Sequence, residues 1–386
     1  MKNKRVSLFA APLIVAQALL GLRVILRLLR SAGGERISIE GALNADEERV
    51  SVIVPVLNEC SRVAPCLEGL IAQGTEVAEI LVVDGGSNDG TQQLVGTYAA
   101  RDPRVRLLDA SPIPADWNGK AWGLQVGLCA TRPGTKWILT VDADVRPGGC
   151  LMPALLGQAR RRSLAALSVA TQQEIESVGE GLLHPSLLTT LVYRFGIPGK
   201  VFRRVSEVQA NGQCFLFRRS ALEACGGFVE AYNSVCEDVT IARTMVAGGY
   251  AVGFYEAGDL VRVKMYANWR DAWLNWTRSL PMHDQYSGIS TLLGWLEVTL
   301  VQALPLPVFL FLLIRNARGD LLMPLNGMLV AVRIGVLFGT GRAYRRRPWS
   351  YWLSPLCDVP VALSLGRSAL KRRHTWRGRI LVRGGL

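Results

Sequence analysis

Apolar residues are distributed unevenly and divide the chain into segments of two kinds. Long apolar runs occupy residues 1–30 and 289–370, whereas residues 50–275 alternate short apolar runs with polar turns. An apolar run of about 20 residues is long enough to cross the hydrocarbon core of a bilayer. We therefore expect an α/β domain flanked by membrane-associated segments.

Short β-branched runs alternate with helical periodicity in the first half of the central region. Strands are predicted at residues 50–56, 79–83, 105–108, 137–141 and 164–170, and helices at 61–73, 91–100 and 119–130. Strand–helix–strand alternation at this spacing is typical of a parallel sheet with right-handed crossovers. The predicted fold class is α/β, with a Rossmann-like, mostly parallel central sheet.

The second half of this region has a less regular pattern. The pattern predicts a helix or interfacial stretch at 181–199, a turn and strand at 208–218, a helix opening at Glu237, and extended pieces at 250–255 and 261–266. Acids at a helix N-terminus, such as Glu237 and Asp238, are also ordinary partners of the helix dipole.

Two carboxylates follow the apolar strand predicted at 137–141. Asp142 and Asp144 are one residue apart at its carboxyl end. Ligands of open α/β sheets bind outside the carboxyl ends of the strands. Oxygen ligands suit Mg²⁺ or Mn²⁺ bridging to phosphates, so this pair predicts a metal and nucleoside-diphosphate site.

Two further strand-end segments carry chemistry suited to a nucleotide. Asp84 ends the strand at 79–83 and precedes a glycine-rich turn, so it is expected to hold a base or ribose, with an Asx turn as the alternative. Asn88 and Asp89 are assigned mainly to that turn. Lys120, at a predicted helix start, offers a cation to phosphate, with an ordinary surface charge as the alternative.

Three motifs in order resemble those of family 2 glycosyltransferases with the GT-A fold. They are V-I-V-P-V-L-N-E at 52–59, L-V-V-D-G-G-S-N-D-G-T at 81–91 and T-V-D-A-D at 140–144. The resemblance implies a nucleoside pocket and a metal-binding Asp-x-Asp pair. The pocket would be lined by Pro55, Asn58, Glu59 and Asp84, and the metal would be held by Asp142 and Asp144.

The resemblance extends to three later segments. The Gly-Lys stretch at 119–120 is similar to that of members that glycosylate carotenoids or are associated with hopanoid synthesis. The segment containing Asn211, Gly212 and Gln213 is similar to a part of the family that approaches the acceptor. The acidic pair implies Asp238 as the catalytic base, with Glu237 orienting it or the acceptor.

The segment 269–278 reads W-R-D-A-W-L-N-W-T-R and predicts a helix in the membrane interface. Processive family members carry Gln-x-x-Arg-Trp nearby, which this chain lacks, so transfer of a single sugar is favoured. We expect Trp276 to contact the acceptor and Arg278 to reach the departing diphosphate.

Charge and hydropathy predict how the chain meets the membrane. The net charge is +13, and from Gly341 onward there are eleven basic residues and one acid, Asp358. A basic tail beside apolar segments indicates a cytoplasmic, anionic membrane surface. No nucleic-acid recognition module is recognisable, so nucleic acid is not an expected partner.

We therefore predict the following organisation: a membrane anchor at 1–30, a linker at 31–49, the GT-A domain at 50–266, an interfacial helix at 267–288, transmembrane or re-entrant helices at 289–366 and a basic cytoplasmic tail at 367–386. The last apolar stretch, 349–365, contains two prolines and Asp358 and fits a re-entrant or interfacial hairpin.

The predicted protein is a multi-pass inner-membrane glycosyltransferase with a cytoplasmic catalytic domain. It would be inverting and Mg²⁺- or Mn²⁺-dependent, moving one sugar from a nucleoside-diphosphate donor, expected to be UDP-linked, to a carotenoid, hopanoid or glycerolipid. The alternatives are a processive polysaccharide synthase and a non-enzymatic membrane scaffold with a degenerate nucleotide-binding domain.

Overall fold

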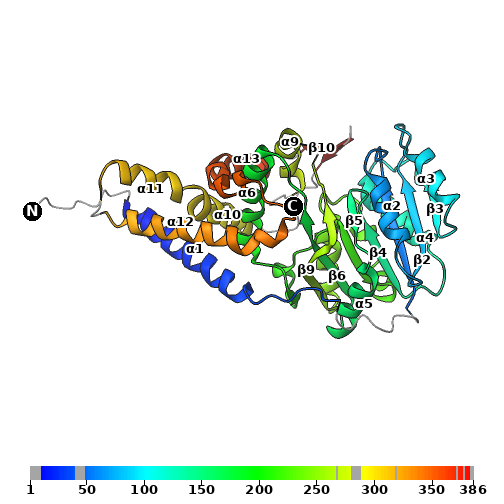
Figure 1. Ribbon diagram of the computed structural model, residues 1–386. Helices are drawn as coiled ribbons and strands as arrows, with labels where there is room; N and C mark the ends of the chain where they lie inside the picture. The colour runs from blue at the N-terminus through cyan, green and yellow to red at the C-terminus, as the bar shows by residue number, and fades with distance from the viewer. Residues whose placement is uncertain are drawn as a thin grey trace, which may run out of the picture. The chain divides into compact units, whose positions relative to one another are not determined.

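The computed structural model describes residues 10–39, 48–266, 268–279, 288–317, 320–370, 373–376 and 379–382 (Figure 1). The chain forms two compact units, which are described separately. The helical unit holds the described residues within Met1–Gly33, Ile175–Ile197 and Tyr266–Lys371. The sheet unit holds those within Gly34–Glu174, Pro198–Met265 and Arg372–Leu386.

The first half of the sheet unit has the predicted strand–helix alternation. Its elements are β1 (Val50–Val56), α2 (Val63–Ile71), β2 (Val77–Asp84), α3 (Thr91–Ala99), β3 (Val105–Asp109), α4 (Gly119–Ala130) and β4 (Trp137–Val141). The strands pair in parallel in the order β3-β2-β1-β4. Crossover helices between parallel strands give the α/β class that the alternation predicts.

The second half adds strands of both directions to the same sheet. Its elements are β5 (Val145–Pro147), α5 (Leu151–Arg161), β6 (Ala166–Gln173), β7 (Lys200–Phe202), η1 (Val205–Glu207), β8 (Cys214–Arg218), α7 (Arg219–Ala224), η2 (Val229–Ala231), α8 (Glu237–Ala247) and β9 (Val252–Val263). Strand β8 is antiparallel to β4 and β6, whereas β6 and β9 are parallel.

Strand β9 is one continuous element where the sequence predicts two extended pieces. The pattern is interrupted at Gly258, which has a φ of 53°. The pairing of β9 with β6 is irregular at this point, as expected of a bulge. A bulge shifts the alternation of apolar positions, which explains why periodicity divides the strand.

Helices cover both faces of the sheet, and the buried strands supply side chains to both. Val52 and Val54 of β1 pack in a core cluster with residues of α2, α3 and α5, whereas Ile53 packs in a second cluster with residues of α4, α7 and α8. Successive side chains of a strand point to opposite faces. This double burial accounts for the continuous apolar runs in the sequence.

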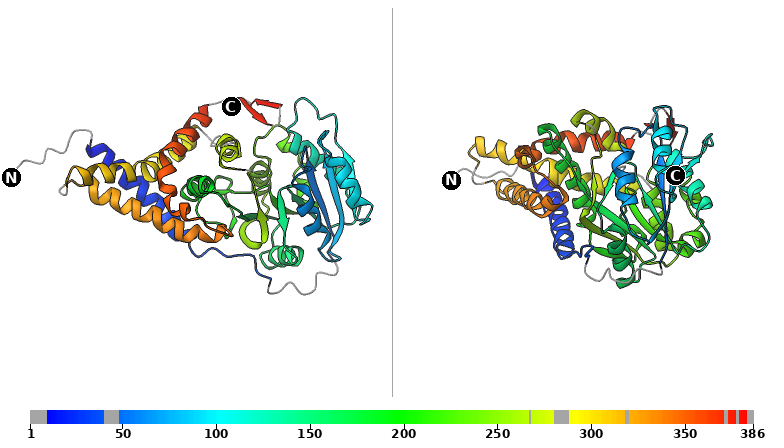
Figure 2. Two further views of the ribbon diagram at one scale, coloured as in Figure 1. Left: turned by 45° about the horizontal axis from the view of Figure 1, so that its top comes forward. Right: turned by 45° about the vertical axis from the view of Figure 1, so that its right-hand side comes forward.

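The strand register brings four chain segments to one edge of the sheet. Val56 at the end of β1 is paired with Asp84 at the end of β2, and Val141 at the end of β4 with Cys214 at the start of β8. We call this the carboxyl edge; Figure 2 shows the sheet from two further directions.

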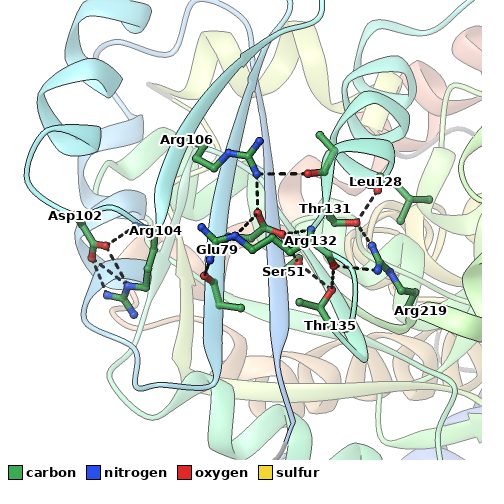
Figure 3. Close-up of polar contacts among 12 residues, drawn as sticks. Ser51, Glu79, Asp102, Arg104, Arg106, Leu128, Thr131, Arg132, Thr135 and Arg219 are labelled. Atoms are coloured by element: carbon green, nitrogen blue, oxygen red, sulfur yellow. Dashed lines mark hydrogen bonds and ion pairs between the residues drawn. The ribbon is translucent and has the colours of Figure 1, made fainter.

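A buried glutamate ties together the opposite, amino edge of the sheet (Figure 3). Glu79 is fully buried and accepts hydrogen bonds from Ser51 Oγ at 2.7 Å, Arg106 Nη1 at 2.9 Å and the Arg132 amide at 2.6 Å. Charges buried in proteins are normally paired and hydrogen-bonded in this way.

The helical unit consists mainly of apolar helices. Its elements are α1 (Ala10–Ser31), α6 (Val178–Phe195), α9 (Trp269–Ser279), α10 (Gly288–Glu297), the π-helix η3 (Val298–Ala303), α11 (Pro305–Ile314), α12 (Leu322–Thr340), η4 (Gly341–Ala343), η5 (Trp349–Cys357) and α13 (Asp358–Leu370). Within the described residues, three helical segments are long and apolar enough to cross a membrane: Ala11–Ser31, Gly288–Ile314 and Leu322–Ala343. The π-helical turn lies just before Pro305, and both π-helical turns and prolines are common sites of helix kinks.

Polar pairs connect these helices inside the unit. Glu297 is 3% exposed and its carboxylate lies 2.9 Å from Arg27 Nη1 and 3.0 Å from Arg23 Nε. Farther along, Arg333 of α12 and Asp358 of α13 form a buried pair at 2.8 Å. In the sheet unit, two strands of the basic tail, β10 (Arg373–Trp376) and β11 (Arg379–Val382), pair with each other.

Candidate active site

The two predicted metal ligands lie at the carboxyl edge, between β4 and β5. The amide of Asp142 donates to Gln213 O at 3.0 Å, which joins this loop to the start of β8. The Oδ1 atom of Asp144 is buried and has no hydrogen-bond partner in the described part of the chain.

The environment of Asp144 suits a cation. Burial, followed by the charge of Asp142, raises the pKa of the Asp144 carboxyl to about 7. A buried carboxylate oxygen without a donor is costly, and a divalent ion bound by oxygen ligands would satisfy it. The pair therefore fits Mg²⁺ or Mn²⁺, although no group of three or more His, Cys, Asp or Glu side chains with metal-binding geometry occurs among the described residues.

Lys120 lies between acids from two different elements. Its Nζ atom is 2.7 Å from Asp142 Oδ1 and 2.7 Å from Glu237 Oε1. Burial disfavours the ammonium, but the carboxylates of Asp142, Glu237 and Asp238 outweigh it and raise the pKa of Lys120 well above its usual value. The lysine is therefore a charged member of the site and not an ordinary surface residue.

The start of α4 fixes the backbone of Lys120. Asn118 is buried, and its side-chain oxygen accepts a hydrogen bond from the Lys120 amide at 2.9 Å, while its Nδ2 donates to Ser234 O at 2.7 Å. Asparagine is a preferred N-cap residue. Asn118 is absent from the sequence prediction, although its place before Gly119 is the N-cap signal that would have identified it.

The predicted base, Asp238, lies in the first turn of α8. Its Oδ2 accepts a hydrogen bond from the Gly212 amide at 2.7 Å, and its Oδ1 accepts one from the Val239 amide at 2.8 Å. Burial, followed by the charge of Glu237, nevertheless raises the pKa of Asp238 to about 7. A carboxyl group with this pKa exchanges a proton readily near neutral pH.

Gly212 leaves the space that this cluster occupies. A Cβ at this position would lie 2.9 Å from Lys120 Nζ, 3.0 Å from Glu237 Oε1 and 3.3 Å from Asp238 Cβ. Contacts this short force neighbouring atoms to move, so the position requires glycine for close approach.

The other two residues of the predicted acceptor segment bond to the sheet. Gln213 Oε1 accepts hydrogen bonds from Thr171 Oγ1 at 2.7 Å and Asn211 Nδ2 at 3.0 Å, and Asn211 Oδ1 accepts one from the Gln213 amide at 3.1 Å. These bonds order the backbone that carries Gly212. A contact of either side chain with an acceptor remains a prediction.

Asp84 is buried and organises its own turn. Its Oδ2 accepts hydrogen bonds from the amides of Gly86 at 3.1 Å and Ser87 at 2.9 Å and from Gln92 Nε2 at 2.6 Å. Asp89 forms the second half of the turn by accepting from the Thr91 amide at 3.1 Å, as predicted. The carboxylate of Asp84 is thus already well supplied with donors, and its role toward a nucleoside remains a prediction.

The remaining predicted donor residues follow β1 at the same edge. Asn58 is exposed, has a φ of 56°, and accepts a hydrogen bond from the Asn88 amide at 2.9 Å. Glu59 is buried and pairs with Arg62 Nη2 at 2.7 Å. Pro55 is half-buried at the end of β1. Arg62 is missing from the sequence prediction, although its i,i+3 spacing from Glu59 is a recognisable pairing signal.

The last two predicted site residues belong to the helical unit. Trp276 is fully buried, and its indole nitrogen has no hydrogen-bond partner among the described residues, whereas Trp269 of the same helix is 48% exposed. An indole at headgroup depth is expected to be exposed on the protein surface, and of the two tryptophans only Trp269 is. Arg278 lies in α9, but its side chain falls outside the described part of the chain.

The parallel half-sheet thus carries acids and a lysine gathered at its carboxyl edge. Residues 51–226 match the model of Glycosyl transferase family 2. This part of the chain is therefore a family 2 glycosyltransferase domain, as the three sequence motifs predict.

Several named relatives align with part of this chain. A succinoglycan biosynthesis protein of Rhizobium meliloti is 25% identical over 54% of this chain and 62% of its own length. The 4,4'-diaponeurosporenoate glycosyltransferase of Staphylococcus aureus is 25% identical over 62% of each chain. The N-acetylglucosaminyl-diphospho-decaprenol L-rhamnosyltransferase of Mycobacterium tuberculosis is 27% identical over 57% of this chain and 78% of its own. The first of these relatives is thus matched over less than two thirds of its length.

A solved structure shares the fold. The mannosyltransferase of Pyrobaculum calidifontis, determined with GDP-Man and Mn²⁺, superposes with a TM-score of 0.52 at 17% identity, covering 93% of this chain and 99% of that one. The expected fold class is thereby confirmed.

Proposed function

We propose that this protein is a membrane-bound, metal-dependent, inverting glycosyltransferase that moves one sugar from a nucleoside-diphosphate donor to a lipophilic acceptor. One observation carries the proposal: Asp142, Lys120, Glu237 and Asp238 lie together at the carboxyl edge of the sheet, in mutual contact through Lys120 and Gly212. Such a cluster supplies both parts that the reaction needs, namely charge for a leaving diphosphate and a base for an acceptor hydroxyl.

The donor half of the site would bind the nucleotide. Asp142 and Asp144 would hold Mg²⁺ or Mn²⁺, which when bound supplies positive charge for the diphosphate. Asn58, Glu59, Asp84 and Pro55 are proposed to line the nucleoside pocket at the ends of β1 and β2. Lys120 adds a cation for the phosphates.

The acceptor half would carry out proton transfer. In a direct displacement, the acceptor oxygen forms a bond to the anomeric carbon while the bond from that carbon to the phosphate oxygen breaks. The proton of the acceptor hydroxyl passes to the Asp238 carboxylate, and the electron pair of the broken bond leaves with the diphosphate. A single displacement inverts the anomeric configuration.

The apolar helices are proposed to cross the membrane three times. Arg23 and Arg27 near the end of α1 pair with Glu297 of α10, while Gln17 pairs with Asn326 near the start of α12 at 2.9 Å. In each of these pairs the two residues would lie at the same depth in the membrane if α1 and α12 cross it in one direction and α10–α11 in the opposite direction. The basic residues after α12 then mark the cytoplasmic side, with the catalytic domain on that side.

The relatives suggest the class of acceptor. One is named for a carotenoid acid and another for a decaprenol-linked sugar, both with long hydrocarbon chains. A carotenoid, hopanoid or glycerolipid acceptor therefore fits a domain attached to membrane helices. A UDP-linked donor is proposed, and the mannosyltransferase solved with GDP-Man makes GDP-linked donors the natural comparison.

The test is to incubate membranes containing the protein with labelled UDP- and GDP-sugars and Mg²⁺ or Mn²⁺, then to extract and identify the labelled product. Label in one lipid species, absent from membranes containing the Asp238→Asn variant, supports the proposal. A ladder of polymer would instead establish a processive synthase, and absence of both transfer and donor hydrolysis would favour a scaffold.

A further inference from the structure

Lys120 connects the two halves of the proposed site. It contacts Asp142, a proposed metal ligand from the loop after β4, and Glu237, from the first turn of α8, at 2.7 Å each. The side chains of the three residues are only 17%, 27% and 9% exposed, in the order Lys120, Asp142 and Glu237. Neither acid is therefore free while this bridge is made.

The charges explain why the lysine takes this position. The negative charges of Asp142, Glu237 and Asp238 all stabilise the positively charged form of Lys120. Bringing three carboxylates together without a cation is unfavourable, because each disfavours ionisation of the others. The ammonium therefore neutralises the cluster when no donor is bound.

The bridge can be released without moving the backbone. Asn118 fixes the Lys120 amide at the start of α4, whereas the ammonium sits at the end of a flexible four-carbon stem. The start of a helix is a favourable place for a phosphate group. By rotating its side chain, Lys120 could exchange its carboxylate partners for such a phosphate.

We propose that Lys120 is a positioning residue that competes with the divalent cation for Asp142 in the donor-free enzyme and that moves to the diphosphate when the donor binds. This inference rests on the proposed function. It has two consequences: the cation binds poorly without nucleotide, and Glu237 is released only after the donor is in place.

The test is to measure Mn²⁺ binding to the full-length protein in detergent, with and without UDP or GDP, by electron paramagnetic resonance. A lysine that competes for Asp142 weakens Mn²⁺ binding, so Lys120→Met should bind nucleotide-free Mn²⁺ about tenfold more tightly than the wild type. The same variant should bind the nucleotide about tenfold more weakly, because a cation for the diphosphate is lost. Tighter Mn²⁺ binding together with weaker nucleotide binding would indicate competition. A purely structural role for Lys120 would instead weaken the binding of both ligands.

Two further variants serve as controls. Lys120→Arg keeps the charge and should retain weak nucleotide-free Mn²⁺ binding, and Lys136→Met removes an exposed lysine at the other end of β4 and should match the wild type. If the wild type binds Mn²⁺ with nucleotide but Lys120→Met shows no gain without it, the inference is overturned and the proposed function stands. If neither protein binds Mn²⁺ under any condition, both are overturned.

Discussion

Asp238 Oδ2 accepts a 2.7 Å hydrogen bond from the backbone amide of Gly212. The two residues are 26 positions apart, and they meet because β8 begins at the edge of the sheet where β4 ends. The bond places a carboxylate of α8 against a backbone that has no side chain to obstruct it. This relationship connects the sheet topology to the proposed chemistry.

Replacing Asp238 with Asn should reduce sugar transfer by about 10²–10⁴-fold, because the amide cannot accept the acceptor proton. Donor binding should stay near the wild-type value, since asparagine has nearly the same size and shape as aspartate and Asp238 is assigned to the acceptor half of the site. Transfer rates and the dissociation constant for UDP or GDP measure the two effects. Asp259→Asn, at an exposed acid of β9, is the matched control and should retain activity. Full activity of the Asp238 variant would remove it from the mechanism.

Transfer should depend on pH through the ionisation of Asp238. Its pKa is raised to about 7 by burial and then by Glu237, with Lys120 acting in the opposite direction. The base is active only when deprotonated, so kcat/KM should fall about tenfold per pH unit below this value and level off above it. In the unliganded protein a raised carboxyl pKa stabilises the fold at low pH, and this contribution is lost as the pH rises through about 7. A rate independent of pH between 5 and 8 would contradict this assignment.

Gly212→Ala should impair transfer without unfolding the protein. The added methyl group would lie 2.9 Å from Lys120 Nζ and 3.0 Å from Glu237 Oε1, so both side chains must shift. Misplacement of about 1 Å near reacting groups can cost about 100-fold in rate. Gly149→Ala is the control, because a Cβ there meets nothing within 4 Å. Equal activity of the two variants would show that the close approach at Gly212 is unimportant.

Glu79→Ala should destabilise the protein while leaving the chemistry of the site intact. Removing this buried carboxylate would leave Arg106 and the Arg132 amide without their partner (Figure 3). Leaving donors without their buried acceptor costs about 1–3 kcal/mol, because the Arg106 side chain that remains is itself 40% exposed. Chemical unfolding in detergent measures the loss. Glu223→Ala is the control, because this carboxylate is 54% exposed in its pair with Arg219, and its loss should cost less than about 1 kcal/mol.

The strands and the Asp142–Asp144 pair were predictable because they depend on local patterns. Apolar runs buried on both faces give strands, and acids that directly follow such a run must lie at the edge of the sheet. The contacts of Lys120 were not predictable in this way. They depend on the antiparallel entry of β8 and on the position of α8, which bring Glu237 across from another part of the chain.

The course of β9 and the burial of Trp276 could not be predicted from local sequence patterns either. A glycine bulge in β9 divided one strand into two apparent pieces, because it shifts the alternation at Gly258. The sequence predicts an interfacial helix at 269–278 but does not reveal that Trp276 is buried while Trp269 is exposed. Burial depends on which helices pack together, and in the helical unit α9 packs with α6 and α13.

The central claim is that one sugar is transferred to a lipid with inversion. The most direct test is to supply the full-length protein with a labelled nucleoside-diphosphate sugar and membrane lipids, and then to determine by NMR the number and anomeric configuration of sugars on the product. The account predicts one sugar per lipid with the configuration opposite to that of the donor. A polymer, or a product that retains the donor configuration, would contradict it.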